Sequence, residues 1–209
     1  MTNIEVESRG PLSMEDFARA KNFLEKNGRF KGENKRLSLM YFRNKFPKDM
    51  TEIKDEKVDL RIRVTNGQAE LVLKYGTFSA SDSRKEISIF FAQTDIEKYI
   101  DLLALLDWYL CVAYATKAYT FDYEGVEFGL IEIFGYGHNF EAEILTTEEK
   151  IPQAKEKIEQ LLKSLRLKVF TQDEFDKQCS DINNQKGLQF DLSKQKYEEI
   201  EDKFSEVLK

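Results

Sequence analysis

The stretch Ile4-Glu5-Val6-Glu7-Ser8-Arg9 decides the fold, because its polar and apolar residues alternate with the period of a β-strand. Successive side chains of a strand point to opposite faces, so Glu5, Glu7 and Arg9 share one face. On a single strand, such a face is typical of a polar side turned to solvent. Its meaning therefore depends on whether other strands repeat the pattern.

Later predicted strands repeat the alternation, first with cations and then with carboxylates. The cationic positions are Arg61, Arg63, Lys74, Arg84 (followed on its strand by Glu86) and Lys117. The acidic pair returns in Phe140-Glu141-Ala142-Glu143-Ile144. Like charges side by side across a sheet repel, so the joint pattern favours a bound polyanion and metal-binding carboxylates over a plain solvated surface.

The chemistry of these residue types points to a nucleotide or polyphosphate. Mg²⁺ and Mn²⁺ take oxygen ligands, usually a few carboxylates together with phosphate oxygens of the substrate. Arginine forks and lysine ammonium groups hold phosphate chains. The single histidine, His138, excludes His-based triads and His-rich metal sites.

Composition narrows the class of protein further. The 209 residues suffice for one domain with an appendage, and 41% hydrophobic with 33% charged residues is typical of a globular chain. A formal net charge of -6 argues against nucleic-acid binding. Cys111 and Cys179 lack metal-ligand spacing, and no apolar run approaches the roughly 20 residues of a membrane span. We expect a cytoplasmic protein without membrane contact.

Strands and helices can be placed from periodicity and turn signals. Strands are predicted at residues 3–9, 36–43, 58–64, 70–75, 84–91, 110–122, 126–134 and 139–145, and helices at 13–28, 94–107 and 148–163. Asn66-Gly67 is a strong hairpin signal, and Gly135-Tyr136-Gly137 is interpreted as a hairpin turn. Eight strands, mostly in hairpin order, indicate an antiparallel α+β domain. A closed barrel could turn its apolar face outward under helices and line its interior with the polar face.

The last forty residues differ from the rest in composition. Helices are predicted from Thr171 through Phe175 and over residues 196–208, with an interruption at 183–187. We therefore expect two parts, a β-rich domain at residues 1–168 and a C-terminal helical appendage at 169–209.

An ordered set of short motifs resembles the CYTH superfamily, also called triphosphate tunnel metalloenzymes. The N-terminal Glu-x-Glu-x-Lys strand of that family is matched by Glu5-Val6-Glu7-Ser8-Arg9. Leu60-Arg61-Ile62-Arg63, Leu71-Val72-Leu73-Lys74, Arg84-Lys85-Glu86, Lys117 and a Gly-x-Gly turn before Glu141 and Glu143 follow in the family's order. The resemblance spans roughly residues 3–165.

The resemblance implies an eight-stranded antiparallel tunnel with a polar lumen. It implies Mg²⁺ or Mn²⁺ at Glu5, Glu7, Glu141 and Glu143, and a triphosphate-containing small molecule held by Arg61, Arg63, Lys74, Arg84, Glu86 and Lys117. Arg9, Glu5 and Glu7 would be the catalytic residues. The hallmark lysine, however, is Arg9 here, and arginine does not lose its proton usefully, so Arg9 is expected to bind phosphate.

Three functions stay open at this stage. The first is a metal-dependent hydrolase of inorganic triphosphate or of a small organic triphosphate such as a nucleoside or thiamine triphosphate. The second is a class IV adenylate cyclase that makes cyclic AMP from ATP. The third is a non-catalytic triphosphate-binding module, for which the replacement of lysine by Arg9 is the motivating observation. A homodimer is the assembly to test.

Overall fold

A computed structural model describes residues 4–76, 79–80 and 83–208. Residue 3, where the first strand was predicted to begin, lies outside this part. The helices and strands, in chain order, are β1 (Ile4–Leu12), α1 (Met14–Asn27), β2 (Arg29–Arg43), α2 (Met50–Glu56), β3 (Val58–Thr65), β4 (Gln68–Tyr75), β5 (Ser83–Phe91), α3 (Ile96–Leu105), β6 (Trp108–Tyr123), β7 (Val126–Ile133), β8 (Gly137–Thr146), α4 (Ile151–Ser164), α5 (Gln172–Asn183), β9 (Gln189–Asp191) and α6 (Tyr197–Leu208).

The strands form one sheet in the order β2-β3-β4-β5-β1-β8-β7-β6-β9. An additional pairing of β2 with β6 joins the two ends of the eight-strand series, which closes it into an antiparallel barrel. The predicted α+β class and the eight-stranded antiparallel barrel are therefore confirmed. The short strand β9 is an extra strand that pairs with β6 outside the closed series.

The chain contains two compact units, and each draws on several separate segments. Unit 1 consists of Met1–Asn34, Gly76–Glu86 and Lys117–Asp176. Unit 2 consists of Lys35–Tyr75, Ile87–Thr116 and Lys177–Lys209. We describe the packing of each unit separately.

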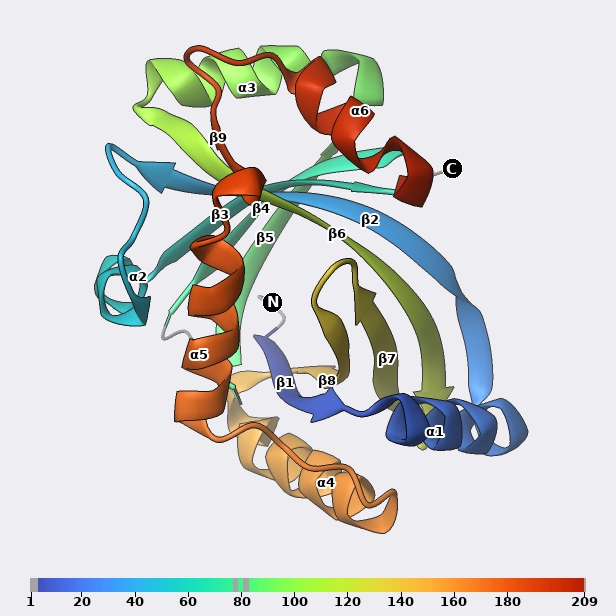
Figure 1. Ribbon diagram of the computed structural model, residues 1–209. Coiled ribbons are helices and arrows are strands. Elements are labelled where there is room, and N and C mark those ends of the chain that lie inside the picture. The colour runs from blue at the N-terminus through green and yellow to red at the C-terminus, as the bar shows by residue number, and fades with distance from the viewer. Residues whose placement is uncertain (1–3, 77–78, 81–82, 209) are drawn as a thin grey trace. The chain divides into compact units, whose positions relative to one another are not determined.

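In unit 1, the helices α1 and α4 pack on the apolar faces of β1, β7 and β8 (Figure 1). Val6, Phe128, Phe140 and Ala142 are almost completely buried on this face, and every second residue along these strands belongs to it. The stripe of α4 that meets them consists of Ala154, Ile158, Leu161 and Leu162. Burial of each Leu or Ile side chain stabilises the fold by about 1.5–3 kcal/mol. A one-residue shift in the pairing would turn these apolar side chains to the opposite face, so their burial fixes the register of the strands.

The first helix of unit 1 begins where the sequence predicts. The Ser13 hydroxyl oxygen accepts a hydrogen bond from the backbone N–H of Asp16, which satisfies one of the amide groups that a helix start leaves unpaired. Asn27 ends the helix, and the Gly28 N–H donates to the Leu24 carbonyl. β1 ends at Leu12 and α1 starts two residues later. This short connection fixes the polar face of β1 relative to α1.

In unit 2, the strands β3 and β4 form the predicted hairpin at Asn66-Gly67. Both residues have positive φ, 49° and 81°, as a two-residue type I′ turn requires. The turn sets a register in which Asp59 lies opposite Lys74, and Arg63 opposite Glu70. These four side chains share one face, and Leu60, Ile62, Val64 and Ala69 are buried on the other.

The C-terminal residues contribute to unit 2 rather than merely following it. Ile182 and Leu188 pack against a core cluster of Met40, Phe42, Leu110 and Val112. Phe190 of β9 pairs with Cys111 of β6, and Ile200 of α6 is completely buried. The division at residues 168 and 169 remains a prediction.

Two elements were absent from the sequence-based assignment. The helix α2 begins after Asp49, whose side chain accepts hydrogen bonds from the backbone N–H groups of Thr51 and Glu52. The strand β9 is only three residues long and depends on pairing with β6. Short elements of this kind carry too few residues for a periodic signal. Within the described ranges, no helix is long and apolar enough to cross a membrane.

Candidate metal and phosphate site

Three carboxylates of unit 1 meet on the face of the sheet opposite α1 and α4. Oxygen atoms of Glu5, Glu7 and Glu143 all lie within 4.8 Å of one another. The strand register causes this, because β1 pairs with β8 so that Glu7 lies directly opposite Glu143. Glu7 is buried, with only 2% of its surface exposed. Residues 136 positions apart in the chain therefore form one acidic cluster.

The acidic cluster continues on the next strand. Glu127 of β7 lies opposite Glu143, so Glu7, Glu143 and Glu127 form a row across three strands. Burial, together with the negative charges of Glu5, Glu141, Glu7 and Glu127, raises the pKa of Glu143 from 4.5 to about 8. Like charges placed opposite one another destabilise a sheet, so the row calls for a compensating cation.

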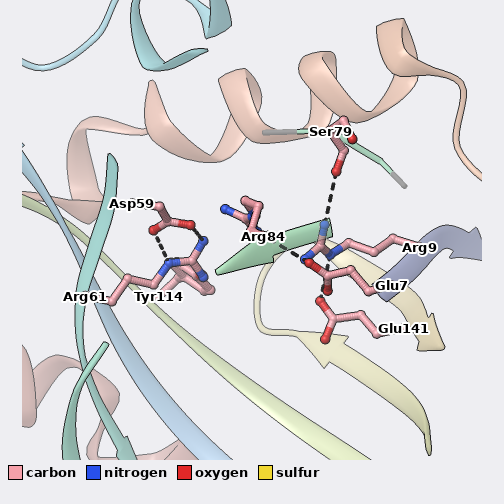
Figure 2. A network of polar contacts seen from close by, with 8 residues as sticks. All are labelled: Glu7, Arg9, Asp59, Arg61, Ser79, Arg84, Tyr114 and Glu141. Atoms are coloured by element: carbon pink, nitrogen blue, oxygen red, sulfur yellow. Dashed lines mark hydrogen bonds and ion pairs between the residues drawn. The ribbon is translucent and has the colours of Figure 1, made fainter. Parts of the chain in front are cut away.

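Arg9 lies at one end of this cluster and is held on several sides (Figure 2). Its guanidinium group forms an ion pair with Glu7, donates from Nε to Glu141 Oε1 at 3.0 Å, and donates from Nη1 to the Ser79 carbonyl at 3.1 Å. It also lies over the Phe175 ring, 5.5 Å from the centroid. The pairing of Arg9 with Glu141 follows from the register, since the two residues are direct cross-strand partners.

Arg84 supplies a second buried cation of unit 1. Its Cα is paired with that of Glu5, and its Nη2 lies 3.4 Å from Glu7 Oε1 (Figure 2). Only 2% of its side chain is exposed. Glu86 lies two residues further on the same strand face and is partly buried. Arg84 and Glu5 are thus neighbours on adjacent strands.

The donor set of the acidic cluster fits a hard divalent cation. Carboxylate oxygens are the ligands that Mg²⁺ and Mn²⁺ prefer, and three of them converge here from two strands. Burying several carboxylates together without a cation is costly, and the raised pKa of Glu143 reflects that cost. Glu5, Glu7 and Glu143 are the residues that would hold the metal. Glu141, the fourth predicted ligand, is paired with Arg9 instead.

Arg61 of unit 2 is engaged by its own neighbours. Its Nε and Nη2 donate to the two carboxylate oxygens of Asp59 at 2.6 and 2.7 Å, and its Nη1 donates to the Tyr114 hydroxyl at 3.0 Å (Figure 2). The side chain of Asp59 is 7% exposed. This bidentate pair fixes the guanidinium plane of Arg61 on the polar face of β3.

Arg63 differs from Arg61 although it lies on the same face. It is 8% exposed, and its Nε has no hydrogen-bond partner among the residues that the structure describes. Glu70 is its cross-strand partner, and Lys74, which is 6% exposed, lies opposite Asp59. A buried guanidinium whose donor lacks an acceptor is costly, so this position favours an anionic ligand.

Lys117 is placed differently from the other predicted phosphate-binding cations. It shares a strand face with Tyr119 and Phe121, which pack in the core of unit 1. Its ammonium group forms an ion pair with Glu33 at 3.0 Å, and hydrogen bonds to Tyr119 and Glu33 raise its pKa. The structure therefore groups Lys117 with Glu33 and Tyr119, not with the acidic cluster.

Two groups of site residues escaped the sequence analysis. Glu127 gives no Glu-x-Glu signal, and only the pairing of β7 with β8 places it opposite Glu143. Asp59 was visible on the same strand face as Arg61, but its bidentate contact depends on side-chain conformation. The alternation of residues 110–114 could have indicated the strand face on which Tyr114 lies, because the even-numbered residues share one side.

Comparisons with known proteins bear on the fold that carries this site. No family model matches the chain, and no curated protein matches it. Among solved structures, PH1819 protein from Pyrococcus horikoshii is 27% identical with a TM-score of 0.67, and the match covers 80% of this chain and 93% of that one. A candidate adenylate cyclase from Vibrio parahaemolyticus is 14% identical with a TM-score of 0.63, covering 97% and 99%.

A third solved structure is a candidate adenylyl cyclase from Hippeastrum that is described as having a dominant triphosphatase activity. It is 18% identical with a TM-score of 0.58, and the match covers 80% of this chain and 89% of that one. The chain shares the fold of these solved structures, a closed eight-stranded antiparallel barrel. The predicted resemblance is therefore confirmed at the level of the fold.

Proposed function

We propose that the protein is a divalent-metal-dependent hydrolase of inorganic triphosphate or of a small organic triphosphate. The observation that carries the proposal is the cluster of Glu5, Glu7 and Glu143 beside the buried cation Arg84. Carboxylates that hold a metal and cations that hold phosphate are the two requirements of phosphoryl-transfer chemistry. The triphosphatase activity described for the Hippeastrum protein supports the same class of reaction.

The proposal gives each group of residues a role. Glu5, Glu7 and Glu143 hold the metal, which when bound supplies a Lewis acid that polarises phosphate oxygens. Arg84 of unit 1 binds phosphate beside the metal. For Arg61, Arg63 and Lys74 of unit 2, phosphate binding stays a prediction from the sequence. Glu86 orients Arg84. The buried Nε of Arg63, which lacks an acceptor among the described residues, supports a ligand at that position.

Arg9 is assigned a role other than that of a base. Arginine stays protonated in proteins, so its guanidinium cannot take a proton from the attacking water. It instead holds the carboxylates of Glu7 and Glu141 in fixed orientations through its ion pairs. The part of Arg9 in the reaction is therefore to position acidic groups and to balance their charge.

The test is phosphate release from inorganic triphosphate, ATP and thiamine triphosphate with Mg²⁺ or Mn²⁺. We expect release from at least one of the three, with loss of most of the activity in Glu5→Ala. Lys117→Ala is a matched control, because Lys117 lies with Glu33 and Tyr119. Turnover that persists in Glu5→Ala, or that does not respond to chelation of the metal, contradicts the proposal.

A cyclase is the second candidate, favoured by the Vibrio parahaemolyticus protein, which matches 97% of this chain. Formation of cyclic AMP from ATP, measured in the same reactions, would select it. A triphosphate-binding module without turnover is the third candidate, because Arg9 cannot act as a base. Calorimetric binding of triphosphate with no phosphate or cyclic AMP formed would select that one. The homodimer stays a prediction that light scattering can test.

A further inference from the structure

The strand register of unit 1 sorts its carboxylates into two kinds. On β8, Glu143 lies opposite Glu7, and Glu141 lies opposite Arg9. On β7, the positions that pair with them are Glu127 and Gly129 respectively. One cross-strand row therefore contains three carboxylates, whereas the neighbouring row contains one carboxylate, one guanidinium and a glycine without a side chain.

The guanidinium of Arg9 is fixed by groups outside the acidic cluster. The Ser79 carbonyl accepts from Nη1, and the Phe175 ring lies against the guanidinium at 5.5 Å. The backbone is held as well, since Arg9 N–H donates to the Ala80 carbonyl and the Phe170 N–H donates to the Arg9 carbonyl, both at 3.0 Å. With 9% of the residue exposed, Arg9 is a built-in part of the site.

Glu7 can serve both the ion pairs and a metal. Arg9 and Arg84 both contact the same oxygen of Glu7, Oε1. A carboxylate has two oxygens and about four lone-pair positions, so one oxygen can accept both guanidinium groups while the other faces a cation. Glu141, by contrast, gives its Oε1 to Arg9 Nε at 3.0 Å and does not belong to the group of converging oxygens.

The cations beside the acidic cluster bear on where a metal ion can bind. Five carboxylates interact here: Glu5, Glu7, Glu127, Glu141 and Glu143. Arg9 and Arg84 both form ion pairs with Glu7, and Lys31 forms one with Glu127. A divalent ion bound at Glu141 would lie beside the Arg9 guanidinium, whose positive charge disfavours it.

We propose that the Arg9 guanidinium is a resident cation that removes Glu141 from the ligand set, so that the chain holds one divalent cation, at Glu5, Glu7 and Glu143. This inference rests on the proposed function, because it presumes that the acidic cluster binds a metal. It assigns Arg9 the place that a second metal ion takes in two-metal phosphoryl-transfer sites. Arg9 is thus a positioning residue whose effect is on metal stoichiometry.

The experiment counts Mn²⁺ ions bound to the purified full chain, by calorimetry and by electron paramagnetic resonance of unbound Mn²⁺. We expect one ion in the wild type. Glu143→Gln and Glu141→Gln form a matched pair on one strand. We expect Glu143→Gln to lower the affinity at least about 10-fold and Glu141→Gln to lower it less than about threefold, because only the former removes a ligand.

Arg9→Met extends the test. Without the guanidinium, Glu141 becomes available next to Glu7, and we expect a second Mn²⁺ ion that is lost again in the double variant Arg9→Met, Glu141→Gln. Circular dichroism checks that each variant is folded. If Arg9→Met does not fold, the pair Glu143→Gln and Glu141→Gln decides the question without it.

The outcomes separate this inference from the proposed function. Two ions in the wild type, or equal losses of affinity in Glu141→Gln and Glu143→Gln, overturn the single-ion inference and leave metal-dependent hydrolysis intact. A wild type that binds no Mn²⁺ overturns both. One ion in the wild type with unequal losses supports the inference whether or not triphosphate is the substrate.

Discussion

The buried charges of the two units differ in how their own neighbours hold them. In unit 1, Arg9 and Arg84 both contact Glu7, whose carboxylate lies beside those of Glu5 and Glu143. In unit 2, Arg61 is occupied by Asp59, but the neighbouring Arg63 is buried without an acceptor for Nε within the described residues. The comparison teaches that charge alone does not mark a ligand site. Buried charge that the protein leaves uncompensated is the informative feature.

The largest expected effect concerns the uncompensated carboxylates. Glu143→Gln should lower the rate of phosphate release on the order of 10³-fold, because it removes a metal ligand and the charge that balances the metal. Initial rates at saturating Mn²⁺ measure this. Glu141→Gln, on the same strand, serves as the comparison and should have the smaller effect. Equal loss in both variants would show that the two carboxylates are equivalent.

The compensated arginine of unit 2 should matter for stability. Arg61→Met leaves the buried carboxylate of Asp59 without its bidentate partner, so we expect the free energy of unfolding to fall by about 3 kcal/mol. Urea denaturation followed by circular dichroism measures it. The double variant Arg61→Met, Asp59→Leu should recover most of the loss, because neither charge is then left alone. A single variant as stable as the wild type would contradict this account.

The uncompensated arginine should behave in the opposite way. Arg63→Met removes a buried cation with an unsatisfied donor, so the ligand-free protein should be unchanged or more stable by about 1 kcal/mol. The affinity for triphosphate should fall about 10- to 100-fold, since a charge-assisted hydrogen bond is lost. Calorimetry and urea denaturation of the same preparation give both quantities. A loss of stability as large as that of Arg61→Met would remove the distinction between the two arginines.

The smallest expected effect is on the pH dependence of the melting temperature. Burial and the nearby carboxylates raise the pKa of Glu143 to about 8, from 4.5. Between these values the folded protein keeps a proton that the unfolded chain has lost, so stability without metal falls as pH rises through this window. Glu143→Gln should flatten the profile across this window, because the group that keeps the proton is gone. Calorimetry in a chelating buffer measures it, and an unchanged slope in the variant would assign the effect to another group.

Much of the architecture could be predicted from local patterns. The alternation in residues 4–9, the Ser13 cap and the Asn66-Gly67 turn each specify an element through interactions only a few residues apart. The same alternation predicted which side chains of β1, β3 and β8 share a face. The pattern Lys117-Ala118-Tyr119-Thr120-Phe121 also held a usable signal, because two aromatic core residues share the strand face of Lys117.

By itself, the sequence determined that glutamates and arginines would stand in rows on the polar faces of an antiparallel sheet, because strand periodicity and turn chemistry are local properties. Only the tertiary structure decided which of these charges meet. The register between β1 and β8 gives Glu143 to Glu7 and Glu141 to Arg9, across more than 130 residues of chain. The register depends on the burial of a whole apolar face under α1 and α4, so it cannot be predicted from any single stretch of the sequence.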